Sequence, residues 1–253
     1  MKQTFSKKQH EVFKKYANIK NTPWKWDEKY LSKTASYLKY LKWIPGVAMI
    51  WVWNSISMNA SRESSDIDLY VVTSNSSMWF VRILLTLIFQ ILWVRKNEKK
   101  HSWRFCLSFF STKKWMDFSS FAIENDIYLY FWIVYFKPIL SYNHTYEDFI
   151  KINNSWADFS EYNYIIEENK KSIIYHNSKN PLNPPYQEEV DQKQKRTWFV
   201  ITYINNLLKK IFLQRTIKTH EKLGKPFWVI INDDMLKFHN NDIRKKISKN
   251  IWL

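Results

Sequence analysis

Two aspartates separated by one residue, Asp66 and Asp68, have the types and spacing for metal chemistry. They begin the segment 66–73, whose β-branched and aromatic residues predict a strand. Side chains alternate along a strand, so both carboxylates would emerge on one face, about 6 to 7 Å apart. Such a pair can share a divalent cation, and Mg²⁺ held by one or two carboxylates also binds phosphate oxygens. The alternative is a strand whose acidic face is simply solvated.

Two further predicted strands would position this pair. Residues 47–53 form a continuous apolar run that is too short for a helix, which predicts a buried strand. The strand ends at Asn54 and Ser55, and a polar turn leads from there to the carboxylates. Residues 103–110 predict a third strand. On strand 66–73 we expect Ile67, Leu69 and Val71 to face a core opposite the carboxylates.

This order of features resembles the DNA polymerase beta-like nucleotidyltransferase superfamily, and in particular a bacterial branch of nucleotidyltransferase-domain proteins. The family's signature is an apolar strand, a Gly-Ser or Gly-Gly turn, a short spacer and Asp-apolar-Asp/Glu-apolar. Residues 65–69 match the second half, and the resemblance covers residues 40–160. The resemblance implies an α/β (α+β) fold with a palm sheet and a Mg²⁺ ion bound by Asp66 and Asp68. It also implies an NTP substrate, with ATP as the first candidate, whose phosphates contact Asn54 and Ser55.

Two positions depart from the family's pattern. Asn54 stands where the family has glycine, although asparagine tolerates left-handed backbone better than most residues. The family's third carboxylate is usually on a later strand, but strand 103–110 has Ser108 and no acid. Three acids elsewhere could substitute for this third carboxylate: Glu63, Glu124 and Asp126. Each is also typical of a helix start or of a solvated loop.

For the other residues that could take part in chemistry or binding, a structural role is an equally open interpretation. His239, Asp242 and Arg244 would reach a phosphate from a C-terminal helix, or belong to a surface helix of mixed charge. Cys106, inside an apolar strand, is expected to be inert packing. Tryptophans and tyrosines between 24 and 43 alternate with lysines, which suits either base stacking or core packing beside extended lysine stems.

The remaining elements divide the chain into three predicted parts. An N-terminal helical segment, 1–45, contains helices 5–20 and 27–43, and a palm domain, 46–120, adds helix 78–94. A mainly helical C-terminal region, 121–253, would hold a buried helix at 128–136, a linker or exposed loop at 176–185, an amphipathic helix at 197–213, a short strand at 227–231 and a basic last helix.

Composition narrows the classes of protein. The 253 residues include 45% apolar residues and 18% aromatics, enough for a core. Two glycines exclude the Gly-rich phosphate loops, and one cysteine excludes a disulfide framework. The apolar run 79–94 would span about 24 Å, short of the roughly 30 Å of a bilayer core. Without a membrane span or an apolar leader in the first 25 residues, the cytoplasm is the expected location.

The charge of the chain is unevenly distributed. The chain carries 39 Lys plus Arg against 23 Asp plus Glu, and the basic residues are concentrated at both ends. Basic ends predict a polyanionic partner such as RNA, or reflect only the codon bias of an AT-rich genome. The first hypothesis is therefore a Mg²⁺-dependent nucleotidyltransferase with a hydroxyl acceptor, RNA among the candidates. The alternative is a catalytically inactive nucleotidyltransferase fold that binds nucleic acid, and a third hypothesis is a membrane-surface protein.

Overall fold

A mixed β-sheet forms the centre of the computed structural model, which describes residues 2–97, 99–176, 192–222, 224, 229–238 and 244–251. The strand order is β5-β4-β1-β2-β3-β7-β6. β2 pairs with β3 and β4 with β5 in parallel, whereas the other neighbours pair antiparallel. The bounds of the strands are β1 Val47–Val52, β2 Ile67–Thr73, β3 Phe105–Thr112, β4 Lys137–Ser141, β5 Tyr175–His176, β6 Ile230–Ile231 and β7 Met235–Lys237.

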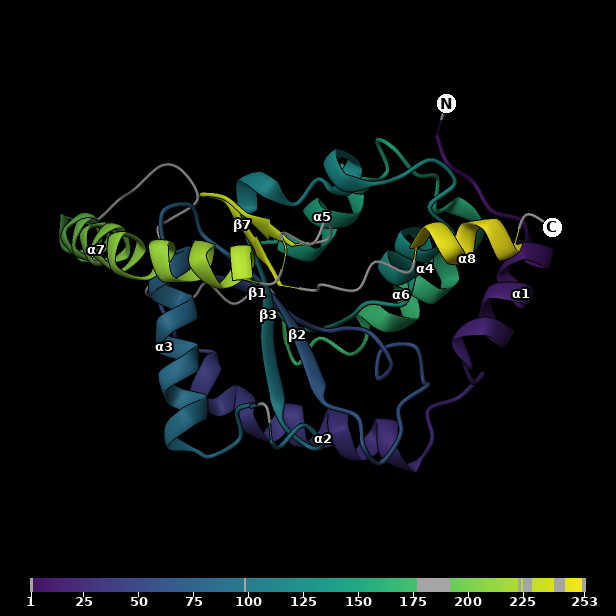
Figure 1. Ribbon diagram of the computed structural model, residues 1–253, viewed down its shortest axis with the longest axis horizontal. Helices are drawn as coiled ribbons and strands as arrows, with labels where there is room; N and C mark the ends of the chain where they lie inside the picture. Colours follow the sequence, from purple (N-terminus) through teal and green to yellow (C-terminus); the bar gives the residue numbers. More distant parts are fainter. Residues whose placement is uncertain are drawn as a thin grey trace.

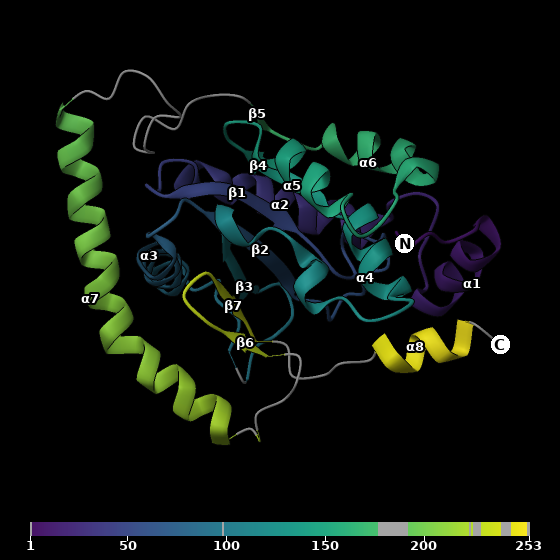
Figure 2. The same ribbon diagram turned by 90° about the horizontal axis from the view of Figure 1, so that it is seen from above.

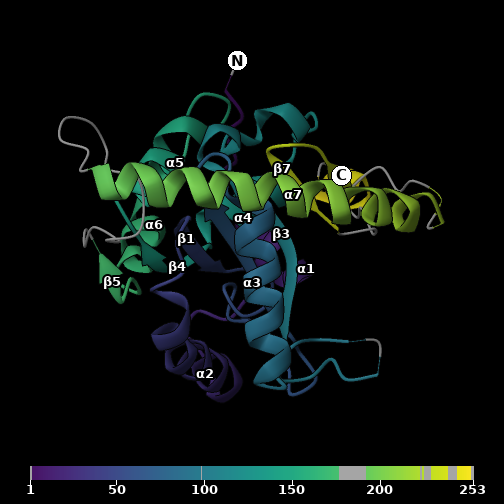
Figure 3. The ribbon, with the colours of Figure 1, turned by 90° about the vertical axis from the view of Figure 1, so that its left-hand side faces the viewer.

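Helices cover both faces of the sheet, which confirms the α/β (α+β) class (Figure 1). α2 and α3 pack on one face, and α1, α4, α5, α6 and α8 gather on the other (Figure 2). α7 crosses the end of α3 (Figure 3). The bounds of the helices, with three short 3₁₀ turns, are α1 Lys7–Ala17, α2 Lys25–Leu41, α3 Met78–Ile91, η1 Lys113–Trp115, η2 Phe118–Phe121, α4 Ile127–Val134, α5 Thr145–Asn153, η3 Ser160–Tyr162, α6 Asn163–Lys170, α7 Gln192–Lys222 and α8 Arg244–Ile251.

The side chains of β2 alternate between two hydrophobic cores. Ile67, Leu69 and Val71 enter the core beneath α2 and α3, as the sequence predicts. Tyr70 and Val72 enter a second core beneath α4 and α5. The face that carries Asp68 is therefore covered by helices rather than solvated, because the strand is buried on both sides.

The two N-terminal helices pack on opposite faces of the sheet. Phe13 of α1 belongs to the core with α4, whereas Tyr30 and Leu38 of α2 belong to the core with α3. Among the interleaved aromatics, Lys20 Nζ lies 3.2 Å from the ring centroid of Trp24. The ammonium groups of several lysines here thus lie over tryptophan rings of their own segment.

The sheet extends beyond the residues 46–120 in which it was expected. β4, β5, β6 and β7 come from the region predicted to be mainly helical. β4, β5 and β7 have two to five residues each, too few for a period-2 pattern to be recognised, whereas β6 lies within the predicted strand 227–231. α7 is longer than the predicted helix 197–213. Most of the predicted loop 176–185 and part of strand 227–231 lie outside the described residues.

The apolar helix predicted at 78–94 is α3, which ends at Ile91. Within the described part of the chain, no helix combines the length and the apolar character needed to cross a membrane. Trp79, Val81, Leu85 and Phe89 are instead buried against the sheet.

Candidate metal centre

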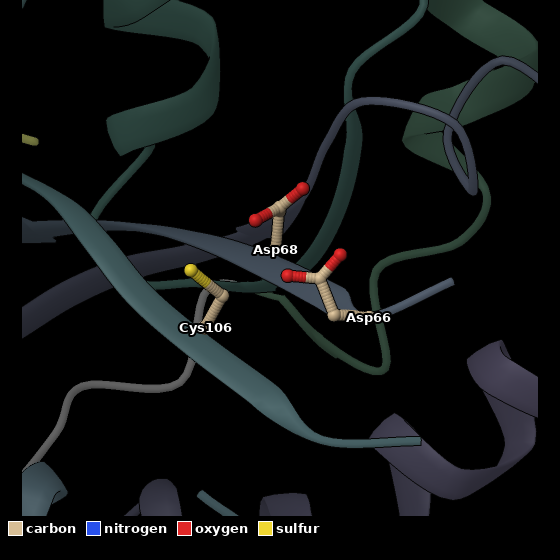
Figure 4. Close-up of side chains that lie close together, drawn as sticks. All are labelled: Asp66, Asp68 and Cys106. Carbon is tan, nitrogen blue, oxygen red and sulfur yellow. The ribbon is translucent and has the colours of Figure 1, made fainter. Parts of the chain in front are cut away.

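The structure brings Asp66, Asp68 and Cys106 together at one end of β2 and β3 (Figure 4). Asp66 directly precedes β2, and Asp68 is its second residue. The parallel register of β2 and β3 places Cys106 beside Asp68. One potential ligand atom from each of the three residues lies within 4.8 Å of the others. We call this group the acidic cluster, and it is a possible metal-binding site.

Burial makes the acidic cluster electrostatically unfavourable. Asp68 is 8% exposed, and burial, followed by the nearby charge of Asp66, raises the pKa of its carboxyl to about 7. Burial and the charge of Asp68 also raise the pKa of the Cys106 thiol to about 12. A cation that bound here would offset the repulsion between the two carboxylates.

Asn54 joins the end of β1 to the acidic cluster. Its φ of 61° is left-handed, the conformation that the glycine of the family's signature adopts readily. Its Nδ2 donates to Asp68 Oδ2 at 2.7 Å, and its Oδ1 accepts from Trp132 Nε1 at 3.2 Å. Asparagine therefore supplies both the backbone conformation and a hydrogen bond that orients the carboxylate, which glycine would lack.

The turn after Asn54 is compact and partly accessible. Met58 N donates to Asn54 O at 3.1 Å, and Ala60 N donates to Ser55 O at 2.7 Å. Ser55 is half-buried, and no hydrogen bond of its hydroxyl to another described residue is present. The structure thus places Ser55 one residue from the group that contacts Asp68, with a hydroxyl available to a ligand.

A buried lysine supports the far end of this turn. Lys137 of β4 donates from Nζ to Asn59 Oδ1 at 2.6 Å. Burial lowers the pKa of Lys137 to about 8, against the opposing effect of Asp27. Asn59 has a left-handed φ of 52°. The turn is therefore held at both ends by asparagines with buried partners.

Lys96 pairs with the more exposed carboxylate. Its Nζ lies 2.6 Å from Asp66 Oδ2. The backbone N of Lys96 donates to Phe105 O at 2.9 Å, which fixes the segment after α3 beside β3. Burial opposes the charge of Lys96, but its hydrogen bond to Asp66 and the nearby Cys106 thiol raise its pKa overall. Sequence spacing gave no signal for this contact, because it depends on the return of the chain from α3.

None of the three acids suggested as a third carboxylate joins the acidic cluster. Glu63 and Glu124 are exposed. Asp126 is buried at the start of α4, where its Oδ1 accepts from Leu129 N at 3.0 Å. Cys106 stands beside Asp68 instead. Its expected role as inert packing stays a prediction. The register between β2 and β3 was needed to find Cys106 as a neighbour of Asp68. The alternation of side chains along the predicted strand 103–110 was only a weak signal.

Arg244 does not offer its side chain to a phosphate at the surface. It is 1% exposed and forms an ion pair with Asp126, with Nη1 to Oδ2 at 2.9 Å. Arg244 thus anchors the start of α8 to α4, whereas Lys245 and Lys246 of the same turn are exposed, as expected for a surface helix. His239 and Asp242, its predicted companions, lie outside the described residues.

Comparisons of this chain with protein-family models, with curated proteins and with solved structures find no match.

Proposed function

We propose that this protein is a Mg²⁺-dependent nucleotidyltransferase that transfers a nucleoside monophosphate from an NTP to a hydroxyl acceptor. ATP is the first candidate for the NTP. The observation that carries the proposal is the position of Asp66 and Asp68 beside a left-handed turn at Asn54. This is the relationship that the motif of polymerase beta-like nucleotidyltransferases implies between its strand, turn and carboxylates. The mixed sheet with helices on both faces is compatible with a palm of that class.

The donor set of the acidic cluster fits Mg²⁺. Asp66 and Asp68 offer carboxylate oxygens, and Mg²⁺ usually takes one or two of these together with phosphate oxygens and water. A thiol is a poor ligand for such a hard cation, so Cys106 would leave its side of the site to water or to the nucleotide. Bound Mg²⁺ would activate the attacking hydroxyl and stabilise the leaving pyrophosphate.

The chain's own residues would divide the remaining work. Asn54 holds the Asp68 carboxylate in one orientation through Nδ2. The Ser55 hydroxyl would donate to a phosphate oxygen from the same turn. Lys96 would move its ammonium group from Asp66 to the triphosphate, where it would offset the negative charge.

The second candidate function is a catalytically inactive nucleotidyltransferase fold that binds nucleic acid, with RNA as the first candidate. Two observations favour it over an unrelated role. Cys106 stands beside Asp68 where a third carboxylate was expected, and Lys96 already neutralises Asp66. The basic ends of the chain would then contact phosphates without any chemistry.

Pyrophosphate release from the four NTPs in Mg²⁺ tests the first function, with RNA, small hydroxyl compounds and proteins offered as acceptors. We expect release with at least one acceptor, abolished by the double substitution Asp66→Asn and Asp68→Asn. Glu63→Gln is the matched control, since it removes one exposed negative charge nearby in the sequence and outside the acidic cluster. Release that survives the double substitution contradicts the proposal. If no acceptor supports release while RNA binds, the second function is the correct one.

A further inference from the structure

A cavity of about 600 Å³ lies between α3 and the C-terminal half of α7. The two helices are fixed where they cross, because Asn205 Oδ1 of α7 accepts from Trp79 N at 2.9 Å and from Phe80 N at 3.2 Å. The buried Asn205 therefore caps the start of α3. This contact holds the walls of the cavity in a defined geometry before any ligand binds.

Basic side chains line this cavity together with aromatic rings. Arg82, Arg95, Arg215 and His220 contribute nitrogen atoms, and the rings of Phe212 and Phe238 form apolar walls. Hydroxyl groups come from threonines of both helices. Within the described part of the chain, no carboxylate contributes to the lining. The cavity therefore combines strong hydrogen-bond donors with apolar surface and has no anion of its own.

Arg82 is the clearest sign that the cavity is built for an anion. Its Nη1 atom is buried and has no hydrogen-bond partner among the described residues, and the same holds for Nε2 of His220. The Arg82 guanidinium is held 4.4 Å from the ring centroid of Phe238 and 5.4 Å from that of Trp79. Burial, followed by the charge of Arg95, lowers the pKa of Arg82 to about 10. A buried cationic donor without an acceptor is costly, and an anionic ligand would remove that cost.

The cavity is continuous with basic surface that leads toward the acidic cluster. Gln90 and Arg95 also line a neighbouring cavity, whose other basic residues are Lys96, Lys99, Lys100 and Arg104. Lys96 in turn contacts Asp66. A path of positive charge thus joins the two sites, which favours a ligand with phosphate groups over an isolated carboxylate.

We propose that the cavity between α3 and α7 is a phosphate-binding site, in which Arg82, Arg95 and Arg215 contact the phosphate oxygens. Arginine suits this role because its planar donors match two phosphate oxygens at once. The phosphate would belong to a small phosphorylated molecule or to the backbone of an RNA strand, and the volume of the cavity admits either a whole nucleotide or one residue of a strand. The inference does not depend on chemistry at Asp66 and Asp68.

Isothermal titration calorimetry of the full chain tests this site, with pyrophosphate and a short single-stranded oligoribonucleotide as separate probes. The buffer contains EDTA, so that no divalent metal links a phosphate to the acidic cluster, and moderate salt, so that unspecific attraction is screened. We expect one site per chain for at least one probe. Arg82→Met and Arg215→Gln should each weaken that binding at least tenfold. Lys218→Gln, which removes the same charge from α7 outside the cavity lining, should change it less than twofold.

The two arginine variants protect the test against misfolding. Arg82→Met removes the unpartnered nitrogen, so we expect a melting temperature no lower than that of the unchanged chain. Arg215 is exposed, so its replacement keeps the fold even if Arg82→Met does not. The probe that binds more tightly identifies the source of the phosphate. No binding of either probe at millimolar concentration, or equal losses in Arg215→Gln and Lys218→Gln, would overturn the proposal.

Discussion

The ammonium group of Lys96 lies 2.6 Å from Asp66 Oδ2, so a cation of the chain itself occupies one side of the carboxylate pair. Both side chains are partly exposed. A pair of this kind contributes at most about 1 kcal/mol, because solvent screens the charges. Lys96 is therefore placed to yield to a metal ion and to move to a phosphate that arrives with it.

Lys96→Gln should strengthen the binding of a divalent metal ion in the absence of nucleotide. It should weaken the binding of nucleotide in the presence of the metal ion. Removal of a competitor worth about 1 kcal/mol predicts up to roughly fivefold higher affinity for Mn²⁺, used as a spectroscopic substitute for Mg²⁺. ATP affinity in the presence of metal should fall. Mn²⁺ titrations followed by electron paramagnetic resonance measure both, with the exposed Lys99→Gln as control. Equal effects of the two substitutions would remove the proposed role of Lys96.

Asp68→Asn should stabilise the metal-free protein while it disables the site. Burial and the charge of Asp66 raise the pKa of Asp68 to about 7. The folded chain therefore retains a proton that the unfolded chain loses above about pH 4, and stability falls as pH rises from 4 to 7. At pH 8 the asparagine variant should be more stable by roughly 2 to 4 kcal/mol in urea unfolding. At pH 4 the two proteins should unfold alike, and a difference there of the same size would show that the effect is unrelated to this charge.

Asn54 should tolerate glycine better than alanine. Both substitutions remove the hydrogen bonds to Asp68 and Trp132. Alanine also meets the penalty of the left-handed backbone, about 1 to 2 kcal/mol, which glycine avoids. Urea unfolding should therefore rank the unchanged chain first, Asn54→Gly second and Asn54→Ala last. If alanine is no worse than glycine, the turn relaxes to another conformation and does not hold Asp68.

His10 should make the fold sensitive to mild acid. It is buried in the aromatic core, with Nε2 2.8 Å from Tyr135 Oη and its ring stacked on Phe131. Burial, followed by the charge of Lys14, lowers its pKa to about 4. Between pH 6.5 and 4 the unfolded chain binds a proton that the folded chain does not bind. The free energy of unfolding therefore falls by up to about 3 kcal/mol as the pH is lowered over this range. Asp68 contributes the opposite pH dependence over the same range, so the test compares chains that both carry Asp68→Asn. In that background His10→Gln should flatten this part of the stability profile, and an unchanged slope would assign the acid sensitivity to other groups.

The centre of the fold could be predicted from sequence because its signals are local. The apolar run before Asn54 became β1, and the alternation of Ile67, Leu69 and Val71 placed these residues in one core. The left-handed turn at Asn54 was suggested by its residue type alone. Each of these features is set by neighbours in the chain.

The surroundings of the carboxylates could not be predicted, because they depend on long-range pairing. The position of Cys106 beside Asp68 follows from the register between β2 and β3. The burial of Asp68 follows from the helices that cover the second face of the sheet, and the role of Asp126 follows from its contact with Arg244 in a distant helix. Such relationships leave no periodic trace in one sequence.

The most direct test of the central claim is to count Mn²⁺ bound per chain by electron paramagnetic resonance, with a non-hydrolysable ATP analogue present. We expect nucleotide-dependent Mn²⁺ binding that the double substitution Asp66→Asn and Asp68→Asn abolishes and Glu63→Gln preserves. Circular dichroism should show that all three proteins are folded. Mn²⁺ binding that is equal in the double variant and in the unchanged chain would contradict the claim that these carboxylates form a metal–nucleotide site.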